Sequence, residues 1–161
     1  MKKILTILLV GIFVASIPAA SSLMLPKMVM QNVSKTPIIT TDVPEWADGN
    51  ISGVFGLKNE TGEYVILGNI SGYYGTWWGY SGVFQGTWET LDGNQSGCFA
   101  GWWIFHLALG SFNVTGSEEE GGYLGLFRTN TTEMTINAIA FGSYEDEHFV
   151  RYAMCSYTEF E

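Results

Sequence analysis

Asparagine carries the clearest chemical signal in this chain, because seven of its eight asparagines begin an Asn-x-Ser/Thr triplet. This triplet accepts N-linked glycan, which is attached to chains that have crossed a membrane. It predicts export and a glycosylated surface, but it names no ligand and no reaction. Only Asn137 lies outside such a triplet. The predicted glycosylation sites are Asn32, Asn50, Asn59, Asn69, Asn94, Asn113 and Asn130.

Three of these triplets have a second explanation. Asn50, Asn69 and Asn94 each lie three residues before the glycine of a recurring Ser-Gly-x-aromatic pattern. Asn and Ser are also favoured in turns, since Asn tolerates positive φ and both side chains bond to nearby backbone. These three asparagines are therefore also predicted to mark turns, whereas the other four share no such frame.

The two cysteines, Cys98 and Cys155, are an even pair in a chain predicted to reach an oxidising compartment. A disulfide between them would close a long loop and contribute roughly 3–4 kcal/mol. The alternative is two buried free thiols, because pairing cannot be deduced from sequence.

Two pairs of adjacent tryptophans, Trp77-Trp78 and Trp102-Trp103, are the candidate ligand-binding residues. Successive strand residues face opposite sides of a sheet, so each pair would place one indole on either side. An indole on an uncovered face could stack on a sugar ring or another flat ligand. The stretch 99–109 has few polar residues, which favours a strand buried on both faces and a core role for the indoles.

No catalytic or metal constellation is recognised, and no cofactor is expected. The sequence has no His-x-x-x-His element, no Gly-x-Ser-x-Gly elbow and no phosphate-binding glycine loop. His106 lies in the apolar stretch and is expected to be a core histidine. The acidic runs 118–120 and 145–147 lack the alternating spacing of a calcium loop and are expected to be solvated turns. A non-enzyme is predicted.

The elements that carry these residues come after a leader. Residues 1–22 are predicted to be a signal peptide, with basic Lys2 and Lys3, an uncharged run 4–17, and small residues at the end. Cleavage is expected after Ser21 or after Ser22. The alternative is a retained N-terminal anchor reaching Leu25, which would be the chain's only contact with a membrane.

Composition bounds the fold and the partners of the chain beyond the leader. Residues 23–45 contain three prolines and predict an extended linker or arm, and 46–161 predict a single all-β domain. Asp and Glu number 16 against 7 Lys and Arg, which argues against a nucleic-acid partner. Twenty glycines and 15% aromatic residues are typical of strands and tight turns.

The recurring Ser-Gly-x-aromatic pattern predicts the architecture. Its glycines are 19, 10 and 15 residues apart, which is too irregular for a repeating coil. About eight strand candidates predict an antiparallel up-and-down meander that forms a barrel or a curved two-layer sheet, with a β-solenoid as the alternative. These candidates include 64–67, 97–109, 123–128, 134–141 and 149–156.

Two local features refine this prediction. Asp92-Gly93 is the strongest turn signal and is predicted to be the central pair of a type I′ turn, in which both residues have positive φ. Glycine weakens a strand unless another group packs closely against it. Because the strand glycines stand beside aromatic residues, rings are predicted to lie across the glycine faces.

The run 44–56, PEWADGNISGVFG, with the later glycine–aromatic strands, resembles secreted archaeal proteins. In those proteins short glycine–aromatic strands follow a signal peptide and a polar linker. The resemblance covers residues 44–155. It implies glycosylation at the same triplet, which archaea use on exported proteins. It implies no activity and no site residue, because the group has no established activity.

Two functions are in view. The first is a secreted or cell-surface, N-glycosylated, non-catalytic structural or envelope protein that could assemble with itself or with other envelope proteins. Its arm, residues 28–42, could lend a strand to a neighbour. The alternative is an extracellular binding module that uses Trp and Tyr to hold a glycan or a small apolar ligand. A hollow or a packed barrel interior would distinguish the two.

Overall fold

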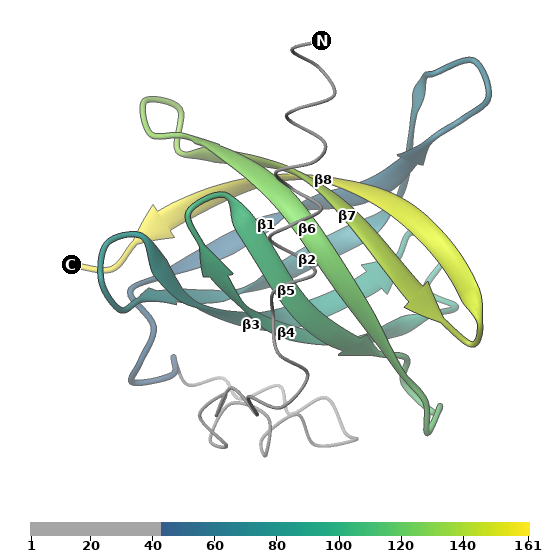
Figure 1. The fold of residues 1–161 in the computed structure, drawn as a ribbon, viewed down its shortest axis with the longest axis horizontal. Helices are drawn as coiled ribbons and strands as arrows, with labels where there is room; N and C mark the ends of the chain where they lie inside the picture. Colours follow the sequence, from purple (N-terminus) through teal and green to yellow (C-terminus); the bar gives the residue numbers. More distant parts are fainter. Residues whose placement is uncertain (1–42) are drawn as a thin grey trace, which may run out of the picture. The chain divides into compact units, whose positions relative to one another are not determined.

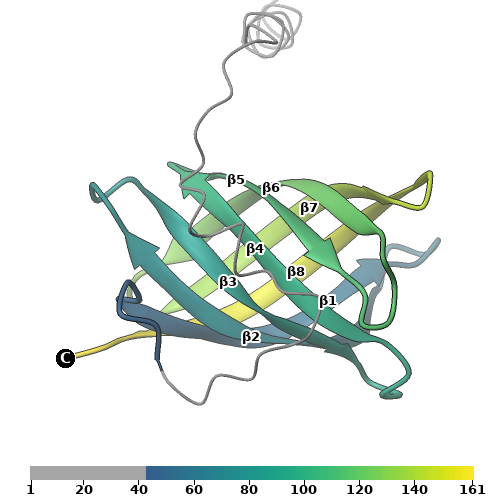
Figure 2. The same cartoon turned by 90° about the horizontal axis from the view of Figure 1, so that it is seen from below.

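The computed structural model describes residues 43–161, and they form an antiparallel barrel (Figures 1 and 2). Each strand pairs with the next, and the last pairs with the first. This confirms the predicted up-and-down meander in its barrel form and does not favour the β-solenoid. The strands are β1 (Gly49–Lys58), β2 (Tyr64–Thr76), β3 (Ser81–Thr90), β4 (Ser96–Ile104), β5 (Leu107–Asn113), β6 (Glu120–Asn130), β7 (Thr135–Tyr144) and β8 (Glu147–Glu159).

Several predictions fall on residues that the structure does not describe. The leader, most of the arm and the glycosylation site Asn32 lie outside residues 43–161. Within that range no helix has the length and apolar character needed to cross a membrane.

The predicted packing of rings on glycines is confirmed on the inner face of the barrel. A Cβ atom on Gly101 would lie 2.7 Å from Cζ of Phe84, and one on Gly86 would lie 2.6 Å from Cζ of Phe99. Phe84 and Gly101 are direct partners across β3 and β4, as are Gly86 and Phe99. Each ring therefore occupies the space that a side chain on the paired residue would need, which restores the packing that glycine lacks.

The predicted strand 97–109 is wrong, because it is two strands. β4 ends at Ile104 and β5 begins at Leu107, with Phe105 and His106 forming the turn between them. Phe105 has a φ of 53°, in the left-handed region that bulky residues rarely adopt. The turn has none of the Gly, Pro, Asn or Asp residues that usually signal a hairpin, so the apolar run concealed it.

The predicted type I′ turn at Asp92-Gly93 is also wrong. Gly93 has a φ of 70°, but Asp92 is not among the residues with positive φ. The carboxylate of Asp92 instead accepts hydrogen bonds from Thr90 Oγ1 (2.6 Å) and the backbone nitrogen of Asn94 (3.1 Å), within a longer connection from β3 to β4. The two-residue turn with positive φ at both positions joins β7 to β8 and consists of Glu145 (48°) and Asp146 (66°).

Candidate functional site

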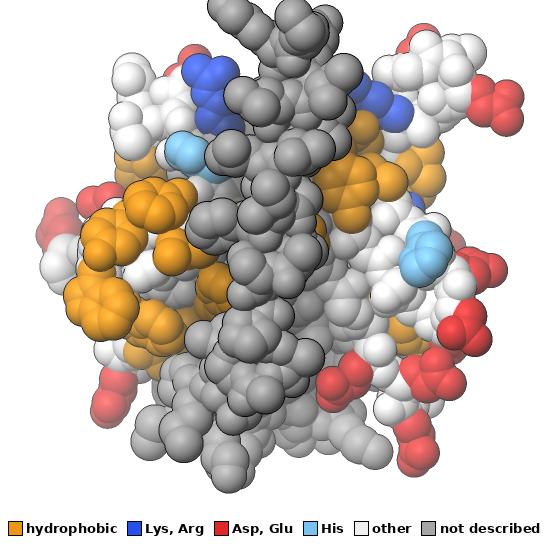
Figure 3. Space-filling model, in the orientation of Figure 1, with side chains coloured by type: hydrophobic (Ala, Val, Ile, Leu, Met, Phe, Trp, Pro, Cys, Tyr) orange, Lys and Arg blue, Asp and Glu red, His pale blue; other side chains and the backbone are white. Residues whose placement is uncertain are grey.

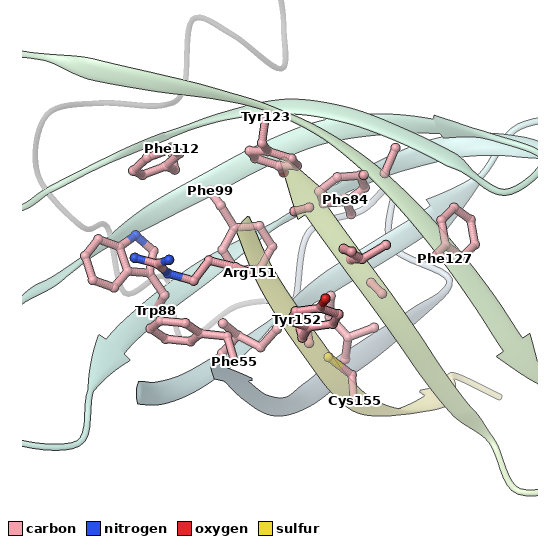
Figure 4. A pocket seen from close by; sticks show the side chains of 18 of the residues that line it. Phe55, Phe84, Trp88, Phe99, Phe112, Tyr123, Phe127, Arg151, Tyr152 and Cys155 are labelled. Carbon is pink, nitrogen blue, oxygen red and sulfur yellow. The ribbon is translucent and has the colours of Figure 1, made fainter. Parts of the chain in front are cut away.

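The barrel encloses a cavity of about 1620 Å³ that is lined by residues of all eight strands. None of the large side chains within residues 43–161 is fully buried, so the interior is hollow instead of packed. Figure 4 shows aromatic side chains from several strands projecting into this space. An eight-stranded barrel has room either for its own side chains or for one small ligand. The geometry of this barrel corresponds to the second case.

Aromatic side chains form much of the cavity wall. Phe55 meets Trp88 edge to face at 6.1 Å between ring centroids, and the Trp88 indole nitrogen donates to the carbonyl of Asn113 at 3.2 Å. Burial raises the pKa of the Tyr123 phenol far above its usual range, so this hydroxyl stays protonated and adds no charge to the wall. Edge-to-face contacts fix ring positions as well as burying area. The aromatic wall comprises Phe55, Tyr74, Phe84, Trp88, Phe99, Trp103, Phe112, Tyr123, Phe127, Tyr144, Phe149 and Tyr157.

Small residues line a second part of the wall and create the space. Ala108, Gly125 and Ala140 are successive partners across β5, β6 and β7. Ala138 and Ala153 form a neighbouring pair across β7 and β8. All five line the cavity. Because none has a side chain larger than a methyl group, this side of the barrel leaves volume that a ligand can use.

Arg151 is the one Lys or Arg of residues 43–161 that lines the cavity. It lies on β8 beside Ala140 of β7 and is half-buried. Its guanidinium carbon lies 5.1 Å from the centroid of the Phe149 ring, and Nη1 donates to the carbonyl of Val150 at 3.1 Å. Burial lowers its pKa, yet an arginine remains charged at neutral pH. Figure 4 shows this side chain among the aromatic residues of the cavity.

The two ends of the barrel differ in character. At the end that we call the aromatic end, the turns 77–80 and 105–106 expose large rings, and Figure 3 shows hydrophobic side chains gathered there. Tyr80 stacks on Phe105 at 5.2 Å, and both line the cavity. The backbone nitrogen of Phe105 also donates to the carbonyl of Tyr80 at 2.6 Å. These contacts hold Phe105 in its unfavourable backbone conformation at the mouth of the cavity.

The opposite end, which we call the acidic end, carries the turns 59–63, 91–95, 114–119 and 145–146. These four turns contain no Lys or Arg. Like charges gathered there repel anions and leave the turns solvated. Their acidic residues are Glu60, Glu63, Asp92, Glu118, Glu119, Glu145 and Asp146.

The candidate tryptophans divide between three environments. Trp103 lines the cavity and meets Phe127 at 6.2 Å, whereas Trp102 faces outward between Val83 and Leu109. This confirms that the second pair faces opposite sides of its sheet. The strand position expected for Trp77 and Trp78 is wrong, because both lie in the turn after β2, and 73% of Trp78 is exposed.

The expectation of a core histidine at 106 is wrong as well. His106 is exposed in the β4–β5 turn, with its ring 6.1 Å from that of Phe127. Among residues 43–161, no group of three or more His, Cys, Asp or Glu side chains is placed to hold a metal ion.

The predicted disulfide is wrong, since Cys98 and Cys155 are both free. They lie on β4 and β8, which are separated by three other strands in either direction around the barrel. Cys155 lines the cavity, whereas Cys98 is next to the inward-facing Phe99 and so faces outward. A disulfide requires Cα atoms within about 7 Å, which opposite walls of a barrel do not provide.

Six of the predicted glycosylation sites lie in the described part of the chain, and none of them lines the cavity. Asn50 and Asn69 lie within β1 and β2, so their predicted place in turns is wrong, whereas Asn94 does lie in a turn. In that turn Nδ2 of Asn94 donates to Oδ2 of Asp92 at 2.7 Å, and Asn59 and Asn130 stabilise their turns through Oδ1. Oδ1 of Asn59 accepts from the backbone nitrogens of Thr61 and Glu63 at 3.1 and 2.8 Å, and Oδ1 of Asn130 makes similar bonds. Glycosylation itself stays a prediction.

Sequence reasoning missed Arg151 and the ring of cavity residues. The available signal was the alternation of β8, where Phe149, Arg151, Ala153 and Cys155 occupy every second position and face the cavity. An arginine in the apolar phase of a strand is a deviation from the usual pattern. Comparison with protein-family models, with curated proteins and with solved structures finds no match to this chain.

Proposed function

We propose that this protein is an exported, N-glycosylated, non-catalytic binding module that holds a small apolar ligand inside its barrel. The observation that carries this proposal is the hollow, largely aromatic cavity of about 1620 Å³. Sites for small molecules typically measure roughly 300–1,000 Å³ and are lined by hydrophobic and aromatic side chains with a few polar groups. The cavity therefore has room for one long ligand or for more than one short ligand.

The placement of the triplet asparagines is compatible with this proposal. None of the six described asparagines lines the cavity, so glycans attached to them in an exported protein would leave the cavity accessible.

The cavity wall is also preformed. Its rings are held by one another, as in the Phe112–Phe149 contact at 5.5 Å. A preformed wall lowers the ordering cost of binding.

Self-assembly through a lent strand has less support. Each of the eight strands is hydrogen-bonded to a neighbour on both sides, so the described sheet has no free edge. Strand addition needs such an edge. A strand from residues 28–42 would therefore need to displace an existing strand before it could join a neighbouring barrel.

The test is a titration of the mature protein with a neutral, environment-sensitive fluorescent probe such as N-phenyl-1-naphthylamine. We expect saturable binding with a blue shift of the probe's emission, because the aromatic wall excludes water. The variant Ala138→Phe places a ring in the cavity and should weaken binding, because the ring fills part of the space beside the small residues of the wall. Asn137→Phe adds the same ring to the adjacent outward position and should not weaken binding. Circular dichroism confirms that both variants fold. Absence of saturable binding, or equal binding by both variants, would refute the proposal.

A further inference from the structure

We propose that Arg151 binds the head group of the ligand, so that the ligand is an apolar molecule carrying one anionic, oxygen-bearing group. A long-chain carboxylate is the simplest molecule of this class. The inference rests on the proposed binding function of the cavity and adds the chemical identity of the ligand.

The position of Arg151 leaves room for such a head group. The residue faces the cavity in phase with Phe149 and Ala153. Its partner on β7 is Ala140, and the partner of Ala140 on β6 is Gly125. The backbone of Arg151 therefore borders a stretch of wall without large side chains, while its guanidinium lies over the Phe149 ring. An anion can approach the guanidinium from the cavity.

The described residues do not supply a counter-ion. The partners of the guanidinium within residues 43–161 are the carbonyl of Val150 and the ring of Phe149, and neither carries a charge. The acidic residues that line the cavity are Asp92, Glu145, Glu147 and Glu159, and the pKa of Arg151 is lowered by burial with no contribution from a charged neighbour. Glu147 is four residues from Arg151, or about 13 Å along a strand. A partly desolvated cation with open donors is stabilised when an anion supplies the missing partner.

Arginine suits this role for a geometric reason. Its planar guanidinium presents donors in a fork that matches the two oxygens of a carboxylate or those of a phosphate. The other described cations of this type, Lys58 and Arg128, do not line the cavity. The surrounding aromatic wall would hold the apolar chain while Arg151 holds the charge, so the two parts of the ligand have separate sites.

The test compares ligands that share a sixteen-carbon chain and differ in the head group, which is an anionic carboxylate in one and a neutral hydroxyl in the other. Hexadecanoate and hexadecanol are each used to displace the neutral naphthylamine probe, at concentrations at which both stay in solution as single molecules. We expect the wild-type protein to bind hexadecanoate about tenfold to a hundredfold more tightly than hexadecanol, the range that hydrogen bonds to a charged group usually give. Arg151→Met should remove this preference and leave hexadecanol binding unchanged, while Arg151→Lys should keep part of it. The matched control, Arg128→Met, removes an outward-facing charge and should change neither ligand.

The outcomes separate the two proposals. Equal binding of both ligands by the wild-type protein, or an unchanged preference in Arg151→Met, would overturn the role of Arg151 while leaving the apolar binding function in place. If neither ligand nor the probe binds, both proposals fail. Binding of the probe to every variant shows that each one is folded.

Discussion

At the scale of single residues, the phase of the alternation within a strand decides what a side chain can do. Cys98 and Cys155 are both on strands, yet one faces outward and the other lines the cavity. Arg151 lies in the same phase as Cys155, four residues earlier on β8, and so it also reaches the interior. Because alternate residues face opposite sides, a shift of one position would expose Arg151 to solvent and remove the anion site.

The two thiols give the first prediction. Burial raises the pKa of Cys155 to about 11 and also raises that of Cys98. The folded state therefore holds the Cys155 proton more tightly than the unfolded state, in which a thiol has a pKa of about 8.5. The free energy of unfolding should fall as pH rises through this window toward 11, and it should fall less in Cys155→Ala. Denaturant titrations of both proteins from pH 8 to 11 measure the difference.

The wild-type protein should show two free thiols when it is unfolded without reductant. In the folded Cys98→Ser variant, the remaining thiol should react slowly with a thiol reagent at pH 8, because little thiolate is present. A mass two units lower than the reduced chain, with no reactive thiol after unfolding, would instead establish the disulfide.

At the scale of elements, glycine and aromatic residues act as pairs across neighbouring strands. Gly110 of β5 lies under the ring of Tyr123 of β6, and Gly121 of β6 lies under the ring of Phe112 of β5. The sequence predicted that rings would cover glycines, because glycines stand beside aromatic residues throughout the strands. It did not predict which glycine faces which ring, because that depends on the register of strands that pair only in the folded barrel.

Two glycines test this arrangement. A Cβ atom on Gly101 would lie 2.7 Å from Cζ of Phe84 and 2.3 Å from the carbonyl oxygen of Leu109, whereas one on Gly122 would have nothing closer than 4.0 Å. Gly101→Ala should therefore destabilise the protein by about 1–3 kcal/mol through overpacking. Gly122→Ala should be neutral or stabilising by up to about 1 kcal/mol, because alanine has less freedom in the unfolded chain. Urea unfolding monitored by fluorescence compares the two, and equal effects would contradict the proposed packing.

At the scale of the whole barrel, the two ends offer different routes to the cavity. Two turns with exposed rings, 77–80 and 105–106, lie at one end, which also carries Glu133 and Glu159. The four turns at the other end hold seven acidic residues and no Lys or Arg. Tyr80 and Phe105 line the cavity at the aromatic end. An apolar molecule with a negative charge is attracted by exposed rings and repelled by a cluster of carboxylates. The ligand should therefore enter through the aromatic end.

The variant Trp77→Ala/Trp78→Ala tests this route. Both indoles are exposed, so their loss should change the free energy of unfolding by no more than about 1 kcal/mol for the two substitutions together. The association rate of hexadecanoate, measured by stopped-flow displacement of the probe, should fall because the apolar surface at the mouth is smaller. The matched variant Glu145→Gln/Asp146→Asn at the acidic end should not slow association. Equal slowing by both variants would show that the aromatic end is not the route.

The sequence by itself determined the local character of this protein. Glycine and aromatic residues between short turns specify antiparallel strands, because these residues suit a pleated surface on which rings cover glycines. The irregular spacing of the pattern was enough to favour a meander over a regular coil. These inferences succeed because each depends on residues that are close together in the chain.

Tertiary structure decided everything that depends on distant residues. Closure pairs Ile51 of β1 with Tyr157 of β8, more than a hundred residues later, and no local pattern signals that contact. Closure also separates the two cysteines and turns Arg151 toward the interior. The size of the cavity depends on how many inward positions carry small residues once the barrel has closed. The physical reason is that enclosed volume belongs to the whole wall and to no single segment of it.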